Sequence, residues 1–578
     1  MQLCSRVTGY FNSMLDRKNF KPESLRGFLM GIIITGSIAE LTAYKIINQD
    51  VAAGEIPYYT PDILIVVLST FEALIAPFFS WWGYQKRRAI LLWYPVIATV
   101  CIIPWFFIPT AGQREELGLC NTTVDGRPTY TGITSTSITR LCLTLFTCIF
   151  VMLARVACSS HGIAYIDEYA PENMSTHYGI LVLARVIILI FGNKMVMSSF
   201  DSSYTSHIFG MVIGLTINIL QVAFIIPRVV PEVDGVQKTP LPLEHRGFLL
   251  TLERVFRNPV VMMQTFAMGL MAAALWGYGY HEIEIIKVKF NFLRENDLLV
   301  DYSDFLIYHL VIIAVLYTAA QYTPPILMKF CNLKAIKQVI LMSVFASLIY
   351  VALSTVTGCD RGVIAGLNQT YESPQCSLSC NCNPQWQEYK PVCMVDNMVT
   401  YLSPCQAGCS NSEVVNGLQV YGNCTCSPTG QVVLGACNNV VCKTSYRLHS
   451  ALFIILVTFT LLVLQAQGVI LLRVSDPRDK STVVGLTLSS VAMIAFACGH
   501  LIYFGIREWT CAWSEDKLCH LQKQSFSYFI GGTSAVMALV SAILSIISLF
   551  FIQVSNTSKS DNHDDEHLSV PPIRKKNE

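Results

Sequence analysis

Long apolar segments separated by shorter polar ones dominate the hydrophobic pattern of this chain. A helix that crosses a bilayer needs about 20 mostly apolar residues. Segments of that kind lie near 25–44, 61–80, 89–109, 139–165, 179–198, 207–227, 260–280, 303–326, 338–356, 448–472, 482–506 and 526–553. The pattern therefore predicts an all-α polytopic membrane protein with twelve transmembrane helices.

The predicted helices form two sets of six, separated by a polar segment that contains several prolines. The turn after the second helix of each set is basic, reading GYQKRR at 83–88 and KFCNLK at 329–334. Two parallel halves of this kind are typical of the major facilitator architecture. The expected parts are a cytoplasmic N-terminal segment (1–24), a first six-helix bundle (25–227), a cytoplasmic linker (228–259), a second bundle (260–553) and a cytoplasmic tail (554–578).

The distribution of Lys and Arg predicts the orientation, because cytosolic loops are enriched in both. With a cytosolic N-terminus, the inner loops carry 23 of these residues in 123 positions and the outer loops 12 in 184. We therefore expect both termini in the cytoplasm. Residues 1–24 lack the apolar core of a signal peptide, so the first helix is expected to act as the signal itself.

Composition narrows the function classes. The 578 residues are 53% hydrophobic and 14% charged, with a mean hydropathy of +0.47, whereas soluble domains are about 25% charged. The net charge of +1 leaves no basic surplus for binding nucleic acid. The dipeptide Gly-Lys is absent, so there is no phosphate-binding loop, and no zinc-protease helix or nucleophile–base constellation is present. We expect no enzyme, no catalytic residue, no metal and no cofactor.

Cysteines and glycosylation sequons, which are typical of extracellular segments, are concentrated on the predicted outer loops. The 357–446 loop contains eleven cysteines and the last outer loop contains Cys511 and Cys519, a density that belongs in an oxidising compartment. Glycosylation sequons at Asn121, Asn368 and Asn423 also lie on outer loops. The residues expected in disulfides are Cys376, Cys380, Cys382, Cys393, Cys405, Cys409, Cys424, Cys426, Cys511 and Cys519; their pairing cannot be deduced from sequence.

Part of this loop resembles a Kazal module, a small disulfide-stapled fold. The resemblance rests on Cys376-x3-Cys380-x-Cys382, PVC at 391–393, TYLSPC at 400–405 and YGNCTC at 421–426. A segment this short and polar depends on cross-links for its stability. We therefore expect a Kazal-like extracellular module at 374–428, between helices nine and ten.

A Kazal-like loop at this place resembles the organic anion transporting polypeptide family of the major facilitator superfamily. The similarity extends to GSIAE at 36–40, STFE at 69–72, GIAYIDE at 162–168 and RVSDPRDKS at 473–481. The region 203–210 lacks the family's tryptophan-rich signature, so the chain is identified as a divergent member. The resemblance implies sodium-independent uptake of amphipathic organic anions across the plasma membrane, among them steroid conjugates, eicosanoids or hormone-like molecules. It also allows an exchanged anion such as bicarbonate; the remaining partner is the lipid bilayer.

Ionisable residues within the predicted helices indicate a structural or functional role, because inserting each charged side chain into a membrane costs roughly 2.5–3.5 kcal/mol on insertion scales. Arg155 and Glu72 are expected on neighbouring helices, either as a structural ion pair or as a guanidinium that binds an anionic substrate while Glu72 orients it. Arg185 is expected either to contact substrate or to pair with Glu40 or Glu72. A proton-coupled role for Glu72 also stays open.

Three further residues complete the candidate substrate site. His500 is interpreted as a hydrogen-bonded core histidine or as a group that couples transport to protons. Trp276 and Tyr280 end the seventh predicted helix and are either interfacial anchors or substrate contacts. The candidate substrate-binding residues are Arg155, Arg185, Glu72, Glu40, His500, Trp276 and Tyr280.

The favoured function is secondary transport by alternating access, in which two bundles rock around a central site. The alternative is a non-transporting membrane receptor or scaffold that acts through its Kazal-like module. Protease inhibition by that module is a weaker hypothesis, since it needs an exposed, rigid reactive segment.

Overall fold

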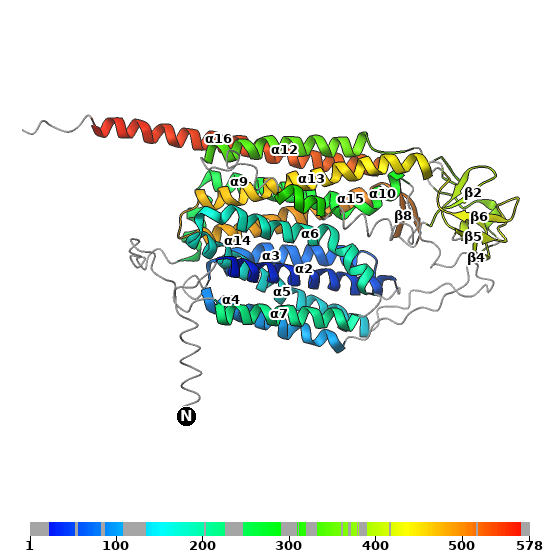
Figure 1. The fold of residues 1–578 in the computed structure, drawn as a ribbon, viewed down its shortest axis with the longest axis horizontal. Coiled ribbons are helices and arrows are strands. Elements are labelled where there is room, and N and C mark those ends of the chain that lie inside the picture. The colour runs from blue at the N-terminus through cyan, green and yellow to red at the C-terminus, as the bar shows by residue number, and fades with distance from the viewer. Residues whose placement is uncertain are drawn as a thin grey trace, which may run out of the picture.

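The computed structural model shows helices lying side by side along one axis, with a small β-sheet at one end (Figure 1). We call that end the sheet end and the opposite one the far end. The described residues are 22–52, 56–82, 87–107, 135–200, 204–225, 247–290, 309, 311–318, 332–359, 362–367, 371–378, 380, 390–415, 418–437, 439–515 and 518–567.

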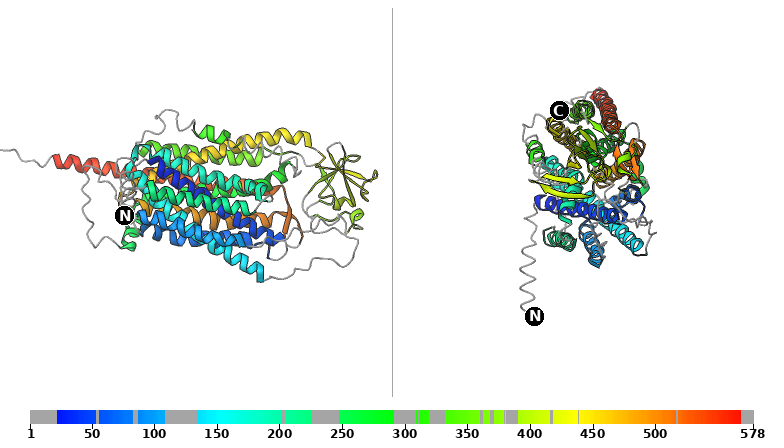
Figure 2. Two further views of the ribbon diagram at one scale, coloured as in Figure 1. Left: turned by 60° about the horizontal axis from the view of Figure 1, so that its bottom comes forward. Right: turned by 90° about the vertical axis from the view of Figure 1, so that its right-hand side faces the viewer.

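The helices form two groups that follow the halves of the chain. The N-terminal group contains α2 (Pro22–Ala52), α3 (Thr60–Trp81), α4 (Arg87–Ile102), α5 (Ser135–Tyr169), α6 (Met174–Phe200) and α7 (Tyr204–Ile225). The C-terminal group contains α8 (Phe248–Phe256), α9 (Pro259–Tyr280), α10 (Glu282–Phe290), α12 (Asn332–Thr355), α13 (Asn439–Val474), α14 (Lys480–Val491), η9 (Ala492–Gly499), α15 (His500–Trp509) and α16 (Ser525–His567). The groups meet where α3, α5 and α6 pack against α9, α13 and α14, and Figure 2 shows the same division from two further sides.

Among the described residues, ten helical stretches are long and apolar enough to cross a membrane. Each of the ten corresponds to one predicted segment, which confirms a polytopic helical membrane protein. The predicted segment 207–227 corresponds to α7, within which the apolar stretch Ile208–Leu220 is shorter than the other ten. Most of the predicted segment 303–326 lies outside the described residues, so a total of twelve stays a prediction.

The surface of the helical body indicates contact with lipid. Large apolar side chains such as Leu74, Leu341 and Phe550 are well exposed, and soluble proteins rarely expose contiguous apolar areas of this extent. The interior is also apolar, with one large core cluster joining both helix groups. Helices that are apolar on all sides suit a bilayer, because one face packs in the protein core and the other contacts lipid, and both surroundings are apolar.

Local sequence signals fix individual helix ends. Helix α9 begins with Asn258 and Pro259: the Asn258 Oδ1 accepts hydrogen bonds from the amides of Val260 (3.1 Å) and Val261 (3.3 Å). An asparagine cap followed by proline at the first helical position is a preferred helix start. This start sets the position of α9, whose last turn reaches the central site.

A lysine fastens the segment after α9 to the end of α12. The buried Lys289 Nζ donates to the carbonyl oxygens of Ser354 (2.8 Å) and Thr357 (2.7 Å). These carbonyls lack partners within a helix that is ending. Burial lowers the pKa of Lys289 to about 8, and this value still leaves the amine mostly protonated at neutral pH.

A six-stranded sheet stands at the sheet end, with strand order β1-β3-β2-β6-β5-β4. The strands are β1 (Val363–Ile364), β2 (Val392–Met394), β3 (Val399–Tyr401), β4 (Asn411–Val415), β5 (Leu418–Gly422) and β6 (Gln431–Leu434). All pairs are antiparallel except β1 with β3. The sheet thus includes strands on either side of the predicted Kazal-like segment 374–428.

Disulfides staple this sheet, as the cysteine density predicts. The described bonds of this region are Cys376–Cys426, Cys393–Cys437 and Cys409–Cys424, and a fourth, Cys511–Cys519, lies in a separate hairpin. Cys380 and Cys405 are also disulfide-bonded, and Cys382 lies outside the described residues. Cys437, which the sequence-based set omits, closes a loop from β2 to the start of α13.

The glycosylation sequons are described at one position. Asn423 is exposed beside the sheet, and its Nδ2 donates to the Ser410 Oγ (2.9 Å). Asn121 and Asn368 lie outside the described residues. The exposure of Asn423 is compatible with glycosylation, which stays a prediction.

A hairpin after α15 attaches the sheet to the helical body. Strands β7 (Cys511–Glu515) and β8 (Leu518–Gln522) pair, and the Cys511–Cys519 bond links them. The hairpin side chains Trp513 and Leu521 share an apolar cluster with Ile364 and Leu402 of the sheet. Because α15 runs directly into this hairpin, the sheet is connected to the C-terminal helix group.

Replacing Trp513 with alanine should loosen this attachment. Its side chain is 6% exposed, and truncating a buried tryptophan typically costs about 3–5 kcal/mol. We expect faster proteolysis within 363–434 in the folded protein, with the helical core retained. Trp509 is 68% exposed, so Trp509→Ala is the matched control; equal protection of both variants would contradict the role given to Trp513.

Candidate functional site

Two adjoining cavities lie between the helix groups. The first has a volume of about 120 Å³ and the second about 160 Å³. Six residues line both cavities: Glu72, Arg155, Arg185, Leu189, Trp276 and Phe496. The walls come from α2, α3, α5 and α6 of one group and from α9 and η9 of the other, and α13 and α14 also line the second cavity. A cavity at such a junction is where a protein of two bundles binds a small molecule.

Charged side chains form a connected network on the N-terminal wall. The Arg155 Nη2 lies 2.7 Å from the Glu72 Oε2 and 3.2 Å from the Glu40 Oε1. The Arg185 Nη1 lies 3.0 Å from the Glu40 Oε2 and donates to the Ser37 Oγ at 2.5 Å. Glu40 therefore bridges two guanidinium groups that come from α5 and α6.

The opposite wall is aromatic. The Trp276 ring lies 5.1 Å from that of Tyr280 and 5.0 Å from that of Phe496, measured between centroids. Phe496 lies in η9, a π-helical stretch inside the candidate span Lys480–Trp509; such turns recur at functional sites. Among the described residues, the buried Trp276 Nε1 has no hydrogen-bond partner. The wall thus combines flat apolar surface with an unused donor.

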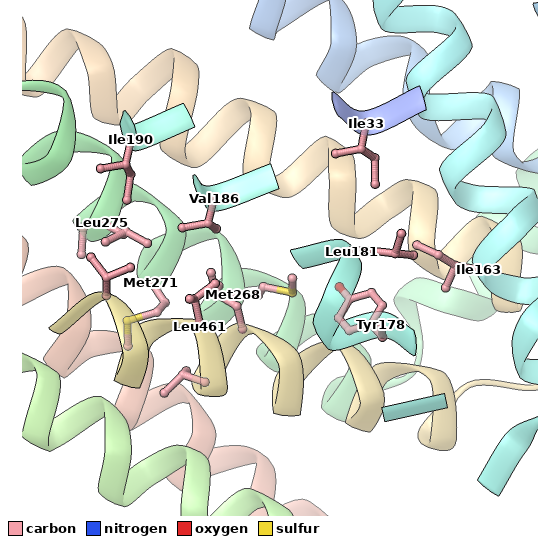
Figure 3. Packing of buried hydrophobic residues seen from close by; sticks show 14 of the residues in the cluster. Ile33, Ile163, Tyr178, Leu181, Val186, Ile190, Met268, Met271, Leu275 and Leu461 are labelled. Atoms are coloured by element: carbon pink, nitrogen blue, oxygen red, sulfur yellow. The ribbon is translucent and has the colours of Figure 1, made fainter. Parts of the chain in front are cut away.

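The second cavity is largely apolar and extends toward the far end. In Figure 3, Val186 and Ile190 of α6 lie near Met268 and Leu275 of α9, with Leu181 and Tyr178 farther along α6, and all six line this cavity. One end of the combined space is therefore charged and aromatic and the other aliphatic. An amphipathic molecule presents the same two kinds of surface.

The cavities are closed at the sheet end by contacts between the helix groups. The Asp62 carboxylate on α3 lies 2.9 Å from the His500 Nε2 and 3.3 Å from the Arg507 Nη2. Between this carboxylate and the first cavity, the hydroxyls of Tyr44 on α2 and Tyr280 on α9 are hydrogen-bonded to each other. Both tyrosines line the first cavity, so they form its roof.

A second set of contacts closes the far end. Asp167 at the end of α5 pairs with Lys480 and lies 3.5 Å from the Arg473 Nη1. In addition, α14 approaches α3 closely at Gly485: a Cβ placed there would lie 2.0 Å from the Ser80 Oγ and 2.9 Å from the Ala76 carbonyl oxygen. Contacts between the two helix groups thus lie at both ends of the helical body, beyond the cavities.

The family follows from the second half of the chain. A model of the Organic Anion Transporter Polypeptide (OATP) family matches residues 231–530, which is more than half of the sequence. The chain belongs to this family. It is therefore a multi-pass protein of a transporter family rather than of an enzyme family.

Curated relatives of this OATP chain are distant. The mouse (Mus musculus) solute carrier organic anion transporter family member 1C1 is 25% identical over 345 residues, 54% of this chain and 46% of that protein. The rat (Rattus norvegicus) family member 1A4 is 32% identical over 175 residues, 26% of this chain and 25% of that protein. The chain spans about half the length of the first of these relatives. The solved human organic anion transporter MFSD10 (TETRAN) is 10% identical, with 91% of this chain and 99% of that one covered and a TM-score of 0.47.

Most of the sequence-derived candidates come together in this OATP chain. Six of the seven line the first cavity: Glu40, Glu72, Arg155, Arg185, Trp276 and Tyr280. His500 lies just beyond the roof, hydrogen-bonded to Asp62. Their binding roles stay predictions. In the described part of the chain, no three His, Cys, Asp or Glu side chains are grouped so as to hold a metal ion.

Sequence reasoning missed several residues of the closures and the cavity. Asp62 and Arg507 are at the ends of predicted helices, where charges are ordinary, and Tyr44 and Phe496 are aromatic residues in apolar segments. Nothing local distinguishes them from lipid-facing or solvent-facing residues. A signal was available only for Asp62, since an aspartate inside the first turn of an apolar helix favours a cationic neighbour.

Proposed function

We propose that the chain is a secondary transporter that takes up amphipathic organic anions across the plasma membrane by alternating access, independently of sodium. The observation that carries this proposal is a pair of adjoining, mostly apolar cavities between two helix groups, with a cluster of charged side chains on one wall and contacts between the groups at both ends. Opening one set of contacts at a time would expose the cavity to each side in turn. Steroid conjugates, eicosanoids and hormone-like molecules combine an apolar body with a negative charge, and an anion such as bicarbonate is a candidate for exchange.

The proposed orientation places the sheet end outside the cell and the far end in the cytosol. The disulfides support this, because they require an oxidising compartment. The Lys and Arg bias supports it as well, since both termini then lie in the cytoplasm with the basic loops. The contacts of Asp62 would thus form the outer closure and those of Asp167 the cytosolic closure.

Uptake by cells that express the chain tests the proposed function. The panel is a labelled steroid sulfate, a prostaglandin, an iodinated phenolic acid and an uncharged, membrane-impermeant sugar as control. We expect several-fold uptake of at least one anion over cells without the chain, unchanged when choline replaces sodium. Cell-surface protein with no uptake of any anion would overturn the proposal and favour a receptor that acts through its Kazal-like module.

A further inference from the structure

A third cavity lies at the sheet end of the molecule and shares no described lining residue with the two central ones. Its volume is about 320 Å³, twice that of the larger central cavity. Its walls come from the end of α10, the end of α12 with the turn that follows it, and the start of α16; Figure 1 shows α10 close to the sheet end. These walls are mostly polar, so this cavity differs in chemistry from the central ones.

This cavity is at the level where membrane-spanning helices end. Thr355 on its wall is the last residue of the candidate span Ala335–Thr355. Ser527 and Tyr528, also on the wall, are in the first turn of the candidate span Ser525–Ile552. Because the ends of a span lie next to the lipid headgroups, the cavity is at the level of the phosphate groups of phospholipids.

Aromatic side chains beside the cavity support this level. Trp509 ends the candidate span Lys480–Trp509 and is 68% exposed, and the centroid of its ring lies 4.9 Å from that of Phe529. Tyr528, on the cavity wall, is 53% exposed. Exposed tryptophan and tyrosine rings are enriched where a membrane meets water. The cavity therefore lies in this interfacial layer.

Lys289 is the one charged residue among the described residues that line the cavity. It is 7% exposed, and its Nζ donates to the carbonyl oxygens of Ser354 (2.8 Å) and Thr357 (2.7 Å). All described hydrogen bonds of this ammonium go to carbonyl and hydroxyl oxygens, and none goes to a carboxylate. Carbonyl oxygens at a helix end carry only partial negative charges, so they hold the ammonium in place without neutralising it.

The start of α16 supplies hydrogen-bond donors to the same cavity. Gln524 precedes the helix and Ser527 is its third residue, and both line the cavity together with Tyr528. The first turn of α16 contains no acidic residue. The first amides of a helix lack partners within it, and their partial positive charge favours a phosphate. The cavity thus combines a buried cation with a helix start that suits an anion.

We propose that this cavity binds one phosphate group, with Lys289 supplying the opposing charge and the start of α16 the hydrogen bonds. A phospholipid and a free phosphate ion share this chemistry. The level of the cavity favours the phospholipid, whose phosphodiester carries one negative charge. The site is separate from the central cavities and does not depend on the proposed transport function.

The surface of α12 also favours a lipid over a free ion. Leu348 and Val351 are 59% and 46% exposed. They lie seven and four positions before Thr355 on the same helix, so the three residues share one face. The acyl chains of a phospholipid whose phosphate occupies the cavity can lie along this apolar face.

Phospholipid binding by the purified full chain tests the inference. The chain is delipidated in a neutral detergent, and native mass spectrometry counts the molecules of dioleoyl phosphatidylcholine bound at each lipid concentration. We expect one molecule to bind at least about tenfold more tightly than dioleoylglycerol, which has the same chains without the phosphate, because hydrogen bonds to a charged group contribute at least about this factor. Inorganic phosphate should displace the lipid only in large excess.

Two variants change the cavity in different ways. Lys289→Met removes the charge, whereas Gly358→Leu fills the cavity and leaves the lysine in place, since no atom lies within 4 Å of a Cβ added to Gly358. Each variant should weaken the binding of phosphatidylcholine at least about tenfold. The matched controls are Lys523→Met, at an exposed lysine next to Gln524, and Gly505→Leu, at an exposed glycine with equally open surroundings. Both controls should bind the lipid as wild type does.

Each part of the inference has its own contrary outcome. Equal binding of phosphatidylcholine by wild type and Gly358→Leu would overturn the site, even where Lys289→Met fails to fold. Dioleoylglycerol that binds as tightly as phosphatidylcholine would overturn the role of the phosphate group. Displacement of the lipid by an equal concentration of inorganic phosphate would overturn the lipid as the source and identify the free ion as the ligand.

Discussion

Replacing Arg155 with alanine is expected to lower anion uptake by about 10- to 100-fold, because a charge-assisted contact to the bound anion contributes about 1.5–3 kcal/mol. The single variant also leaves Glu72 buried without its partner, which destabilises the fold by about 3–5 kcal/mol. Loss of uptake alone is therefore ambiguous. The variant is measured for uptake and for the amount of protein at the cell surface.

The double variant Arg155→Ala/Glu72→Ala separates the two roles of the pair. Removing both partners leaves no unpaired charge from this pair, so surface abundance should recover toward wild type. If Arg155 binds the substrate, uptake stays low. Recovery of uptake together with abundance would show that the pair is only structural.

A second buried ion pair supplies the matched control. Arg140 and Asp50 are 2.9 Å apart with side chains 9% and 2% exposed, and neither lines the cavities. The double variant Arg140→Ala/Asp50→Ala should therefore keep the uptake per molecule at the surface. A loss equal to that of the Arg155 double variant would mean that any buried pair in this body is needed for transport.

The sequence alone predicts the helical architecture well because membranes impose a simple rule. A spanning segment must form all its backbone hydrogen bonds within itself and be apolar for about 20 residues. Ten of the predicted segments are helices that meet this requirement in the described chain. The cysteine-rich sheet is predictable for a similar reason, since short polar segments need cross-links. The bond from Cys393 to Cys437 was missed because the resemblance to a Kazal module ends before Cys437.

The charged residues of the site are all predictable from the sequence, whereas the aromatic ones are predictable only in part: Trp276 and Tyr280 are candidates from the sequence and line the first cavity, and Tyr44 and Phe496 were missed. Arg155, Arg185, Glu40 and Glu72 are conspicuous because charge is rare in apolar helices. Tyr44 and Phe496 have no such contrast with their neighbours, and whether an aromatic ring faces lipid, core or cavity depends on helix rotation. The π-helical turn that contains Phe496 changes that rotation locally, and the spacing of residues in the sequence does not predict such a turn.

Pairing across the two halves also escapes the sequence. Asp62 and Arg507 are separated by 445 positions, and each has the composition of an ordinary helix end. Their contact depends on how two separately packed bundles meet. The same is true of Gly485, whose lack of a side chain matters only because α3 passes directly over it.

Replacing Gly485 with valine is expected to lower uptake at least about tenfold by holding the cytosolic closure open. The added Cβ would lie 2.0 Å from the Ser80 Oγ, 2.3 Å from the Ser80 Cβ and 2.9 Å from the Ala76 carbonyl oxygen. Two of these atoms belong to the rigid part of α3 and cannot rotate away, so α3 and α14 must separate at the far end. A protein that cannot close there cannot close around its cargo, and each 1.4 kcal/mol of bias is tenfold in population.

The free cysteine Cys148 reports the open end directly, because it is buried and lines the first cavity. In Gly485→Val, a membrane-impermeant maleimide should modify Cys148 from the cytosolic face of inverted vesicles, and peptide mass spectrometry distinguishes it from the other cysteines. Gly505→Val is the control: this glycine is on the same span, and no atom lies within 4 Å of the added Cβ, so the variant should transport normally.

A rescue variant tests the clash itself. Gly485→Ala adds only the Cβ, and combining it with Ser80→Gly removes two of the three clashing atoms, so the double variant should transport better than Gly485→Ala alone. If Cys148 of Gly485→Val instead reacts from the outer face, the two ends have been assigned the wrong way round, since a wedge between α3 and α14 opens the cavity only on its own side.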